Sequence, residues 1–317
     1  MIGRLVAALC LSSFVLCPAS RVSAATVRLG EPMMGTVLTV TVIAADEHVA
    51  RVLAEAAVAQ ARHWDDVLTT WRPDGELARL NARAGSGPVE VSADLATALR
   101  AMQALSAATD GLFDPAVGPL VDRWRGPRAP DPPPTASNAT RVATALTLDR
   151  NRAALLPGAA LDAGGIGKGI ALDAMAALLR RGGARAAFLD FGGSSQLAMG
   201  APEPDAPGWR VAIGGLGAGS VLGEIVLRDA ALSTSRAAPG PAASGPIVDP
   251  RTGAPVAEAR IATARAADAT SAEAWTKALT IAGRAALPAA TAHGVAALVE
   301  DRDGIAAAGL TPQPIRP

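Results

Sequence analysis

The sequence is nearly free of cysteine, which limits the chemistry open to it. Its only two cysteines, Cys10 and Cys17, lie within the first 24 residues of a chain of 317. If this segment is removed on export, as argued below, the mature chain carries no thiol. Disulfide bonds, thiolate metal sites and cysteine nucleophiles are then excluded.

Other residue types and charges are scarce as well. Tyrosine is absent, aromatic residues make up 3% of the chain, and 29 basic groups balance 29 acidic ones. The sequence also lacks a long block of like charges. This zero formal net charge argues against nucleic acid or an anionic membrane surface as the main partner. Hydrophobic residues reach 50%, which is ample for the core of a globular protein.

The N-terminal segment has the pattern of a secretory signal peptide. Arg4 supplies the positive charge, Leu5 to Leu16 form an apolar stretch too short to span a bilayer, and Val22-Ser23-Ala24 matches a cleavage site of small residues. We expect residues 1–24 to be removed on export to the bacterial periplasm, with no transmembrane segment in the mature chain. An uncleaved N-terminal anchor is the alternative.

The remaining chain, 25–317, is expected to form one α+β domain with mixed, mostly antiparallel sheets and packed helices. Alternating β-branched residues predict an opening strand or hairpin over Val27–Ile43, interrupted near Pro32–Gly35. A proline-rich surface excursion is expected near 125–139. Apolar periodicity predicts helices over 46–69 and 92–109, capped by Asp46 and Ser92, and further helices over 168–181 and 271–282. Short strands are expected over 144–148, 186–191, 209–213, 224–227, 247–249, 261–264 and 296–300.

The most unusual segment is a glycine-rich stretch from Leu161 to Ile170 that opens one of these helices. Glycines before a helix let backbone N–H groups approach a phosphate, and the helix N-terminus adds positive potential. The stretch is not a Walker A loop, because Asp162 and Gly169 replace a required glycine and a required hydroxyl residue. A simple turn between a strand and a helix is the alternative.

Lysine usage singles out two positions. Only Lys168 and Lys277 are lysine among the 29 basic residues. A compact ammonium kept where arginine is otherwise used suggests a site that needs a point charge. We therefore expect the two lysines to converge on one phosphate group. The three histidines, His48, His63 and His293, are expected to be solvated or structural.

Several segments, taken in chain order, resemble the ApbE-type family of FAD:protein FMN transferases. They are Met34–Thr36, Glu76–Asn81, Gly111–Leu120, Leu161–Gly169, Phe191–Gly193, Ser233–Ser235, Asp249–Gly253 and Ala272–Leu279. The resemblance implies the family fold and an enzyme that cleaves FAD. It would attach FMN through a phosphoester to a Ser or Thr hydroxyl of a periplasmic target flavoprotein.

The resemblance also implies roles for individual residues. Lys168 and Asp249 match catalytic positions. The FAD-binding positions are matched by Met34, Trp71, Leu112, Phe113, Asp114, Asp162, Lys168 and Ile247. The positions that hold Mg²⁺ in the family are matched by Gly165, through its carbonyl, and by Glu273, Thr276 and Lys277.

Three departures bear on this assignment. The family usually has Asp and Thr where this chain has Glu273 and Lys277. Mg²⁺ and an ammonium about 5 Å apart, at an effective dielectric of about 20, repel by roughly 6–7 kcal/mol. Lys277 is therefore expected either to swing away and pair with Glu273 or to stand in the place of the metal. Pro246 replaces a histidine common in the family, and Arg236 replaces a glycine.

These departures leave two functions open. The chain is expected to be an FMN transferase, or a catalytically impaired FAD-binding protein that acts as a flavin carrier or scaffold. An unrelated periplasmic solute-binding protein is a third alternative.

Overall fold

The computed structural model describes residues 24–124, 141–238 and 247–315, and its centre is an eight-stranded sheet. The strands follow one another in the sheet in chain order, and every neighbouring pair is antiparallel. They are β1 (Ala25–Met33), β2 (Thr36–Ala44), β6 (Ala186–Phe191), β7 (Ser195–Met199), β10 (Ala230–Ala237), β11 (Arg260–Ala266), β12 (Ala296–Asp301) and β13 (Gly304–Ala308).

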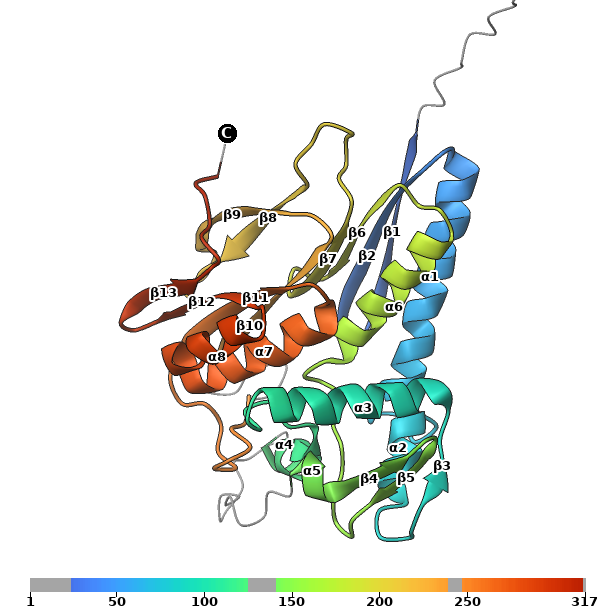
Figure 1. Ribbon diagram of the computed structural model, residues 1–317, viewed down its shortest axis with the longest axis vertical. Helices are drawn as coiled ribbons and strands as arrows, with labels where there is room; N and C mark the ends of the chain where they lie inside the picture. Colours follow the sequence, from blue (N-terminus) through green and yellow to red (C-terminus); the bar gives the residue numbers. More distant parts are fainter. Residues whose placement is uncertain (1–23, 125–140, 239–246, 316–317) are drawn as a thin grey trace, which may run out of the picture.

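Helices cover one face of this sheet (Figure 1). Helix α1 (Glu47–Leu68) packs on β1 and β2, α6 (Gly167–Arg181) on β6 and β7, and α7 (Ala269–Ala282) on β10 and β11. The short helices α8 (Leu287–Ala292) and η3 (Gly283–Ala286) follow α7. Because α6 and α7 pack against each other as well, their N-terminal ends lie close together over the middle of the sheet.

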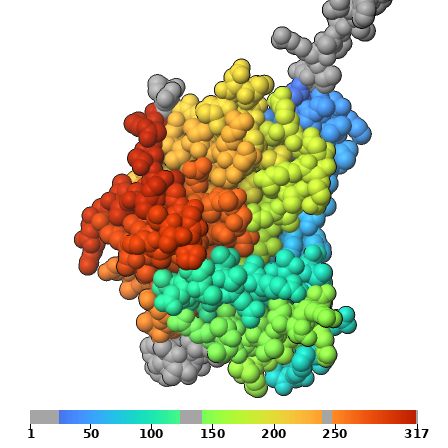
Figure 2. Space-filling view, in the orientation of Figure 1, coloured from blue at the N-terminus to red at the C-terminus, as the bar shows by residue number. Residues whose placement is uncertain are grey.

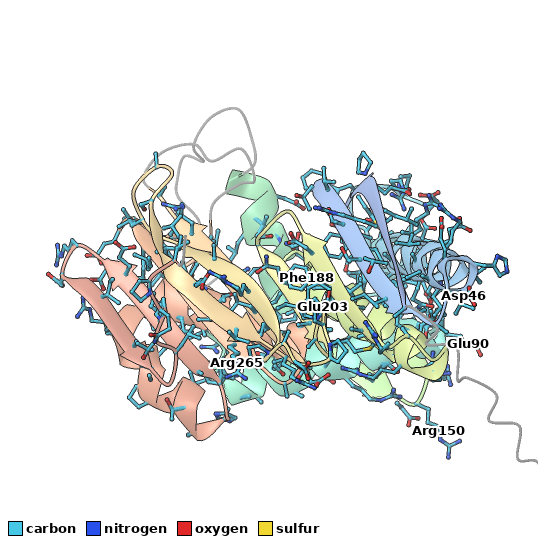
Figure 3. The ribbon with its side chains drawn as sticks, turned by 90° about the horizontal axis from the view of Figure 1, so that it is seen from above. Asp46, Glu90, Arg150, Phe188, Glu203 and Arg265 are labelled. Carbon is cyan, nitrogen blue, oxygen red and sulfur yellow. The ribbon has the colours of Figure 1, made fainter. Side chains whose placement is uncertain are left out.

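The other face carries a β-hairpin of β8 (Trp209–Gly214) and β9 (Val221–Leu227). Phe188 of β6 stacks on Trp209 with ring centroids 5.4 Å apart, and Figure 3 shows Phe188 near the middle of the molecule. A second apolar cluster, which includes Leu232 and Leu298 of the sheet and Leu227 of the hairpin, fills this side.

A smaller group of elements lies across one end of the sheet and its helices, below α6 and α7 in Figure 1. Helix α3 (Ala93–Ala108) separates the two parts, and its surface adjoins those of α6 and α7 in Figure 2. The group comprises α2 (Glu76–Ala82), β3 (Val89–Glu90), η1 (Pro115–Val117), α4 (Gly118–Trp124), α5 (Val142–Ala145), β4 (Leu146–Asp149) and β5 (Arg152–Leu155). Its buried side chains belong to the same apolar core as the main sheet.

The sequence predicted much of this architecture. The antiparallel α+β fold and the β1–β2 hairpin are confirmed, and so are two of the predicted helix caps. Asp46 accepts the Val49 N–H at the start of α1, and Ser92 accepts the Leu95 N–H at the start of α3.

Other expectations were wrong or lie outside the described residues. Helix α7 starts at Ala269 rather than near Ser271 as predicted, because Asp268 caps it by accepting the Ser271 N–H. Residues 247–249 form only an isolated bridge between Val248 and Pro255, and the predicted strand over 144–148 begins at Leu146. Strands β3, β5, β7, β10 and β13 were missed. The signal-peptide prediction and the proline-rich excursion fall on residues that the structure does not describe, apart from Ala24. Within the described ranges, no helix is long and apolar enough to cross a membrane.

Candidate active site

The candidate site begins where helices α6 and α7 meet. The carboxylate of Glu273 is 1% exposed, and its Oε2 accepts the backbone N–H of Gly169 at 2.9 Å. Its Oε1 accepts the hydroxyl of Ser195 from β7 at 2.5 Å and lies 3.5 Å from Nζ of Lys168. Three donors around one buried carboxylate compensate the cost of removing its charge from water.

Helix α7 and strand β10 add a chain of hydroxyl groups. The ammonium of Lys277 donates to Ser235 Oγ at 2.6 Å, and Ser235 donates to Thr276 Oγ1 at 3.0 Å. Thr276 donates in turn to the backbone carbonyl of Glu273 at 2.7 Å, and Ser233 also lies 3.4 Å from Thr276 Oγ1. This chain holds the head of Lys277 against β10.

Lys277 is perturbed by this environment. Burial lowers its pKa to about 8; the carboxylate of Glu273 opposes that change, and the ammonium of Lys168 reinforces it. The two lysines are thus close enough for their charges to interact. This agrees with the expectation from the sequence that they converge. Within the described part of the chain, the ion partner of Glu273 is Lys168, and the expected pairing of Lys277 with Glu273 is not observed.

The glycine-rich turn joins the lysines to a second wall of the site. A Cβ atom placed on Gly165 would lie 2.9 Å from Phe113 Cε2 and 3.7 Å from Lys277 Cγ, so these three residues are in close contact. Only glycine fits here without moving Phe113. Phe113 and Gly165, predicted from different motifs, are therefore brought together beside Lys277.

Asp162 lies at the start of the same turn. Its Oδ1 accepts the Gly164 N–H at 2.7 Å, and its own N–H donates to the Pro115 carbonyl. The side chain of Asn81 fixes the preceding residue, because it both donates to and accepts from the backbone of Leu161. The turn is thus anchored to helix α2 and to the segment after Phe113.

A cavity of about 220 Å³ lies next to Asp162. Trp71, which is 74% exposed, lines it together with Asn81 and Leu161. The remaining lining residues are Thr70, Ala78, Gly118, Asp122, Ala160 and Asp162. Two residues predicted to bind FAD, Trp71 and Asp162, therefore share one cavity, and the turn after Asp162 leads from it to the lysines.

Two other residues predicted to bind FAD, Met34 and Leu112, are partly buried. Met34 has a positive φ of 48° in the β1–β2 turn and is partly buried against the core. That turn adjoins the β6–β7 turn, where Gly192 lies against Thr36 and donates to the Val37 carbonyl. Leu112 is partly buried against the core next to Phe113.

Asp114, another residue matched to an FAD-binding position, is buried. Its side chain is 4% exposed and accepts hydrogen bonds from Ser106 and from the backbone of Ala116 and Val142. Burial raises its pKa, and these hydrogen bonds offset only part of that increase. Its carboxylate points into the protein and holds the Phe113 segment in place, and a contact of Asp114 with FAD stays a prediction.

Asp249 lines a separate cavity of about 210 Å³ with Arg260 and Thr252. Arg251 binds its carboxylate through two nitrogens, at 3.0 and 2.8 Å. Burial alone would raise the pKa of Asp249, but the hydrogen bonds and charge of Arg251 outweigh burial and hold that pKa below its usual range. A carboxylate so stabilised is a weak base. Ile247, predicted to bind FAD and two positions before Asp249, is partly buried.

Arg236, which stands where the family usually has a glycine, points away from helix α7. Successive residues of a strand point to opposite faces, so Arg236 is exposed while Ser235 faces helix α7. The guanidinium donates to the carbonyls of Leu216 and Gly215 in the β8–β9 loop. Pro246 lies outside the described residues.

The histidines occupy solvated or structural positions, as expected. His63 lies 2.7 Å from the carboxylate of Asp94, the ring of His293 packs on Trp275, and His48 is exposed. Ser195 was missed by sequence reasoning, although its place after the Gly192-Gly193 turn was a usable signal. Asp173 was missed as well. Its carboxylate accepts the Ala269 and Thr270 N–H groups and so caps α7 from the side of α6.

The residues matched to the family's metal positions lie together but do not fit Mg²⁺. This ion needs about six oxygen ligands in near-octahedral geometry. Here both Glu273 oxygens already accept protein donors, Thr276 is fully buried in its hydroxyl chain, and the Lys277 ammonium has no lone pair to give. Across the described ranges, no group of three or more His, Cys, Asp or Glu side chains is arranged to hold a metal.

Comparison with known proteins places this arrangement in a family. A curated FAD:protein FMN transferase of Klebsiella pneumoniae is 33% identical to this chain over 212 residues, and one of Rhodobacter capsulatus is 35% identical over 216 residues. Those alignments cover 62% and 64% of this chain but 59% and 40% of the relatives. The chain thus spans about half the length of the curated relatives it matches.

Solved structures agree over a larger extent. The flavin transferase ApbE of Vibrio cholerae is 27% identical, with a TM-score of 0.77 over 90% of this chain and 97% of that one. The ApbE protein of Thermotoga maritima, at 22% identity and a TM-score of 0.78, shares the fold. The model of the ApbE family matches residues 34–299, and the chain therefore belongs to the ApbE family.

Proposed function

We propose that this protein binds FAD at the junction of α6, α7 and the glycine-rich turn, and transfers FMN from it to a Ser or Thr hydroxyl of a target flavoprotein in the periplasm. The observation that carries the proposal is the convergence of Lys168 and Lys277 beside Gly165, in a member of the ApbE family. Relatives of this chain are named FAD:protein FMN transferases.

The chemistry asks three things of the chain. The acceptor hydroxyl oxygen attacks the phosphorus of the FMN half, a phosphoester forms, and the bond to the AMP oxygen breaks. Positive charge must hold the pyrophosphate and stabilise the departing AMP, and Lys168 and Lys277 are placed to supply it. The cavity beside Trp71 and Asp162 is available for an aromatic ring of the substrate.

The acceptor hydroxyl must also lose a proton, and here the support for catalysis weakens. Asp249 is bound bidentately by Arg251, which holds its pKa below the usual range, and Pro246 replaces the histidine that relatives commonly carry. These observations favour a second candidate function, an FAD-binding protein that acts as a carrier or scaffold without transfer.

One assay separates the two functions. The purified protein is incubated with FAD and a flavoprotein domain that carries an acceptor Thr, with and without Mg²⁺. Covalent fluorescent flavin on the domain together with released AMP supports the transferase, and an acceptor Thr→Ala domain is the control. FAD that stays bound while no AMP appears supports the carrier. If FAD does not bind at all, both proposals fail.

A further inference from the structure

The positive charge of the site comes from lysine, a residue type that is rare in this chain. Lys168 and Lys277 are the only lysines of the sequence, and they come from two helices that meet at one point. Lysine is a compact, strongly hydrated point charge, whereas arginine is a broad planar fork. With the single carboxylate of Glu273 between them, the trio carries one net positive charge when all three are ionised.

Protein contacts hold both ammonium groups in place. Ser235 accepts a hydrogen bond from Lys277 at 2.6 Å, and the hydroxyl of Thr276 orients Ser235. Lys168 lies 3.5 Å from Glu273 at the first turn of α6, where the helix N-terminus adds positive potential. The stem of Lys277 passes within contact distance of Gly165, so its charge is delivered beside the glycine-rich turn.

The same contacts take away the oxygen ligands that a divalent cation would need. The two carboxylate oxygens of Glu273 interact with Gly169, Ser195 and Lys168. To coordinate a metal ion, Glu273 would have to give up these interactions. Thr276 uses its hydroxyl proton on the Glu273 carbonyl and accepts from Ser235. A dication would in addition face the ammonium of Lys277 at short range.

We propose that Lys168 and Lys277 together replace a divalent cation, so that this protein binds the pyrophosphate of its ligand without a metal. In identifying the ligand as FAD, this inference rests on the proposed function. The metal-free character of the site rests on the side-chain contacts alone.

The primary test measures binding to the intact protein by titration calorimetry. FAD is titrated in buffer with EDTA and again with millimolar Mg²⁺, and inorganic pyrophosphate is titrated in both buffers as a simpler probe. We expect each ligand's affinity to change by less than twofold between the two buffers. An affinity that falls tenfold or more in EDTA would overturn the inference.

Variants test the assignment to Lys277. Lys277→Met should weaken pyrophosphate binding in EDTA about tenfold or more, and added Mg²⁺ should not restore it. The double variant Lys277→Thr with Glu273→Asp should bind Mn²⁺, seen by electron paramagnetic resonance, whereas the wild type should not. Lys277→Arg keeps the positive charge and is the control for the loss of charge in Lys277→Met. Thermal melts verify that each variant is folded, and stoichiometric Mn²⁺ binding by the wild type would contradict the proposal.

The outcomes separate this inference from the proposed function. Metal-free binding of FAD without transfer of FMN removes the transferase function and leaves the inference standing. Metal-free binding of pyrophosphate without binding of FAD removes FAD as the ligand and again leaves the inference standing. If neither ligand binds in EDTA, the inference is wrong.

Discussion

The backbone N–H of Gly169 in helix α6 donates to the buried carboxylate of Glu273 in helix α7 at 2.9 Å. This hydrogen bond joins the two helices that carry the lysines. It requires a very close approach, because a Cβ on Gly169 would lie 2.5 Å from the carbonyl oxygen of Ala269. The backbones of α6 and α7 thus pack directly on each other, and the site depends on that packing.

Gly169→Ala should therefore destabilise the protein and separate the two lysines. The added methyl meets backbone rather than a flexible side chain, so relief requires α6 and α7 to move apart, at a cost of about 1–3 kcal/mol. Chemical denaturation measures the loss of stability, and FAD titration measures the loss of binding. Gly30→Ala is the matched control, since its Cβ would meet only the Leu38 carbonyl at 3.9 Å. Equal stability of the two variants would disprove the close packing.

Lys277→Met should make the protein more stable at neutral pH, by on the order of 1–2 kcal/mol. The pKa of Lys277 falls from 10.5 to about 8 on folding, so the folded state disfavours the charged form. This penalty is fully present below pH 8. It decreases as the pH rises from 8 to 10.5 and is lost above 10.5, where the lysine becomes neutral in both states. Urea denaturation at pH 7, 9 and 10 should show the advantage of the variant shrinking with pH.

Lys168→Met is the matched control for that experiment and should have the opposite sign. It removes the ion partner 3.5 Å from the buried Glu273 carboxylate, which should cost about 1–3 kcal/mol at neutral pH. A wild type that is more stable than Lys277→Met by the same amount at every pH would show that the ammonium is not destabilised by burial.

Trp71→Ala should weaken FAD binding about three- to tenfold and leave the stability of the protein almost unchanged. The side chain is 74% exposed and lines the cavity beside Asp162, so its removal takes little from the core. Tryptophan fluorescence quenching by FAD gives the affinity for the wild type, and calorimetry gives it for the variant. Val52→Ala, at a 50% exposed position of α1, is the control. An unchanged affinity would remove Trp71 from the binding site.

Local sequence signals predicted the secondary structure well where a cap or a strong alternation was present. Asp46 and Ser92 cap helices, and the β1–β2 hairpin follows from its β-branched residues, because these interactions join residues a few positions apart. Strand β10 was missed because its small polar residues resemble a loop. Its serines face α7 inside the protein, which only the packing of the sheet reveals.

The amino-acid sequence alone determined the family, the antiparallel α+β class and the choice of two lysines as the residues to watch. Only the tertiary structure decided what those residues do. Lys277 is paired with Ser235, 42 positions away, and Glu273 with Gly169, 104 positions away. It likewise directed the carboxylate of Asp114 inward, to the backbone N–H of Val142, 28 positions away. Each of these contacts joins elements that are distant in the chain. The partner of a buried charged group is therefore set by how those elements pack, which the local sequence does not specify.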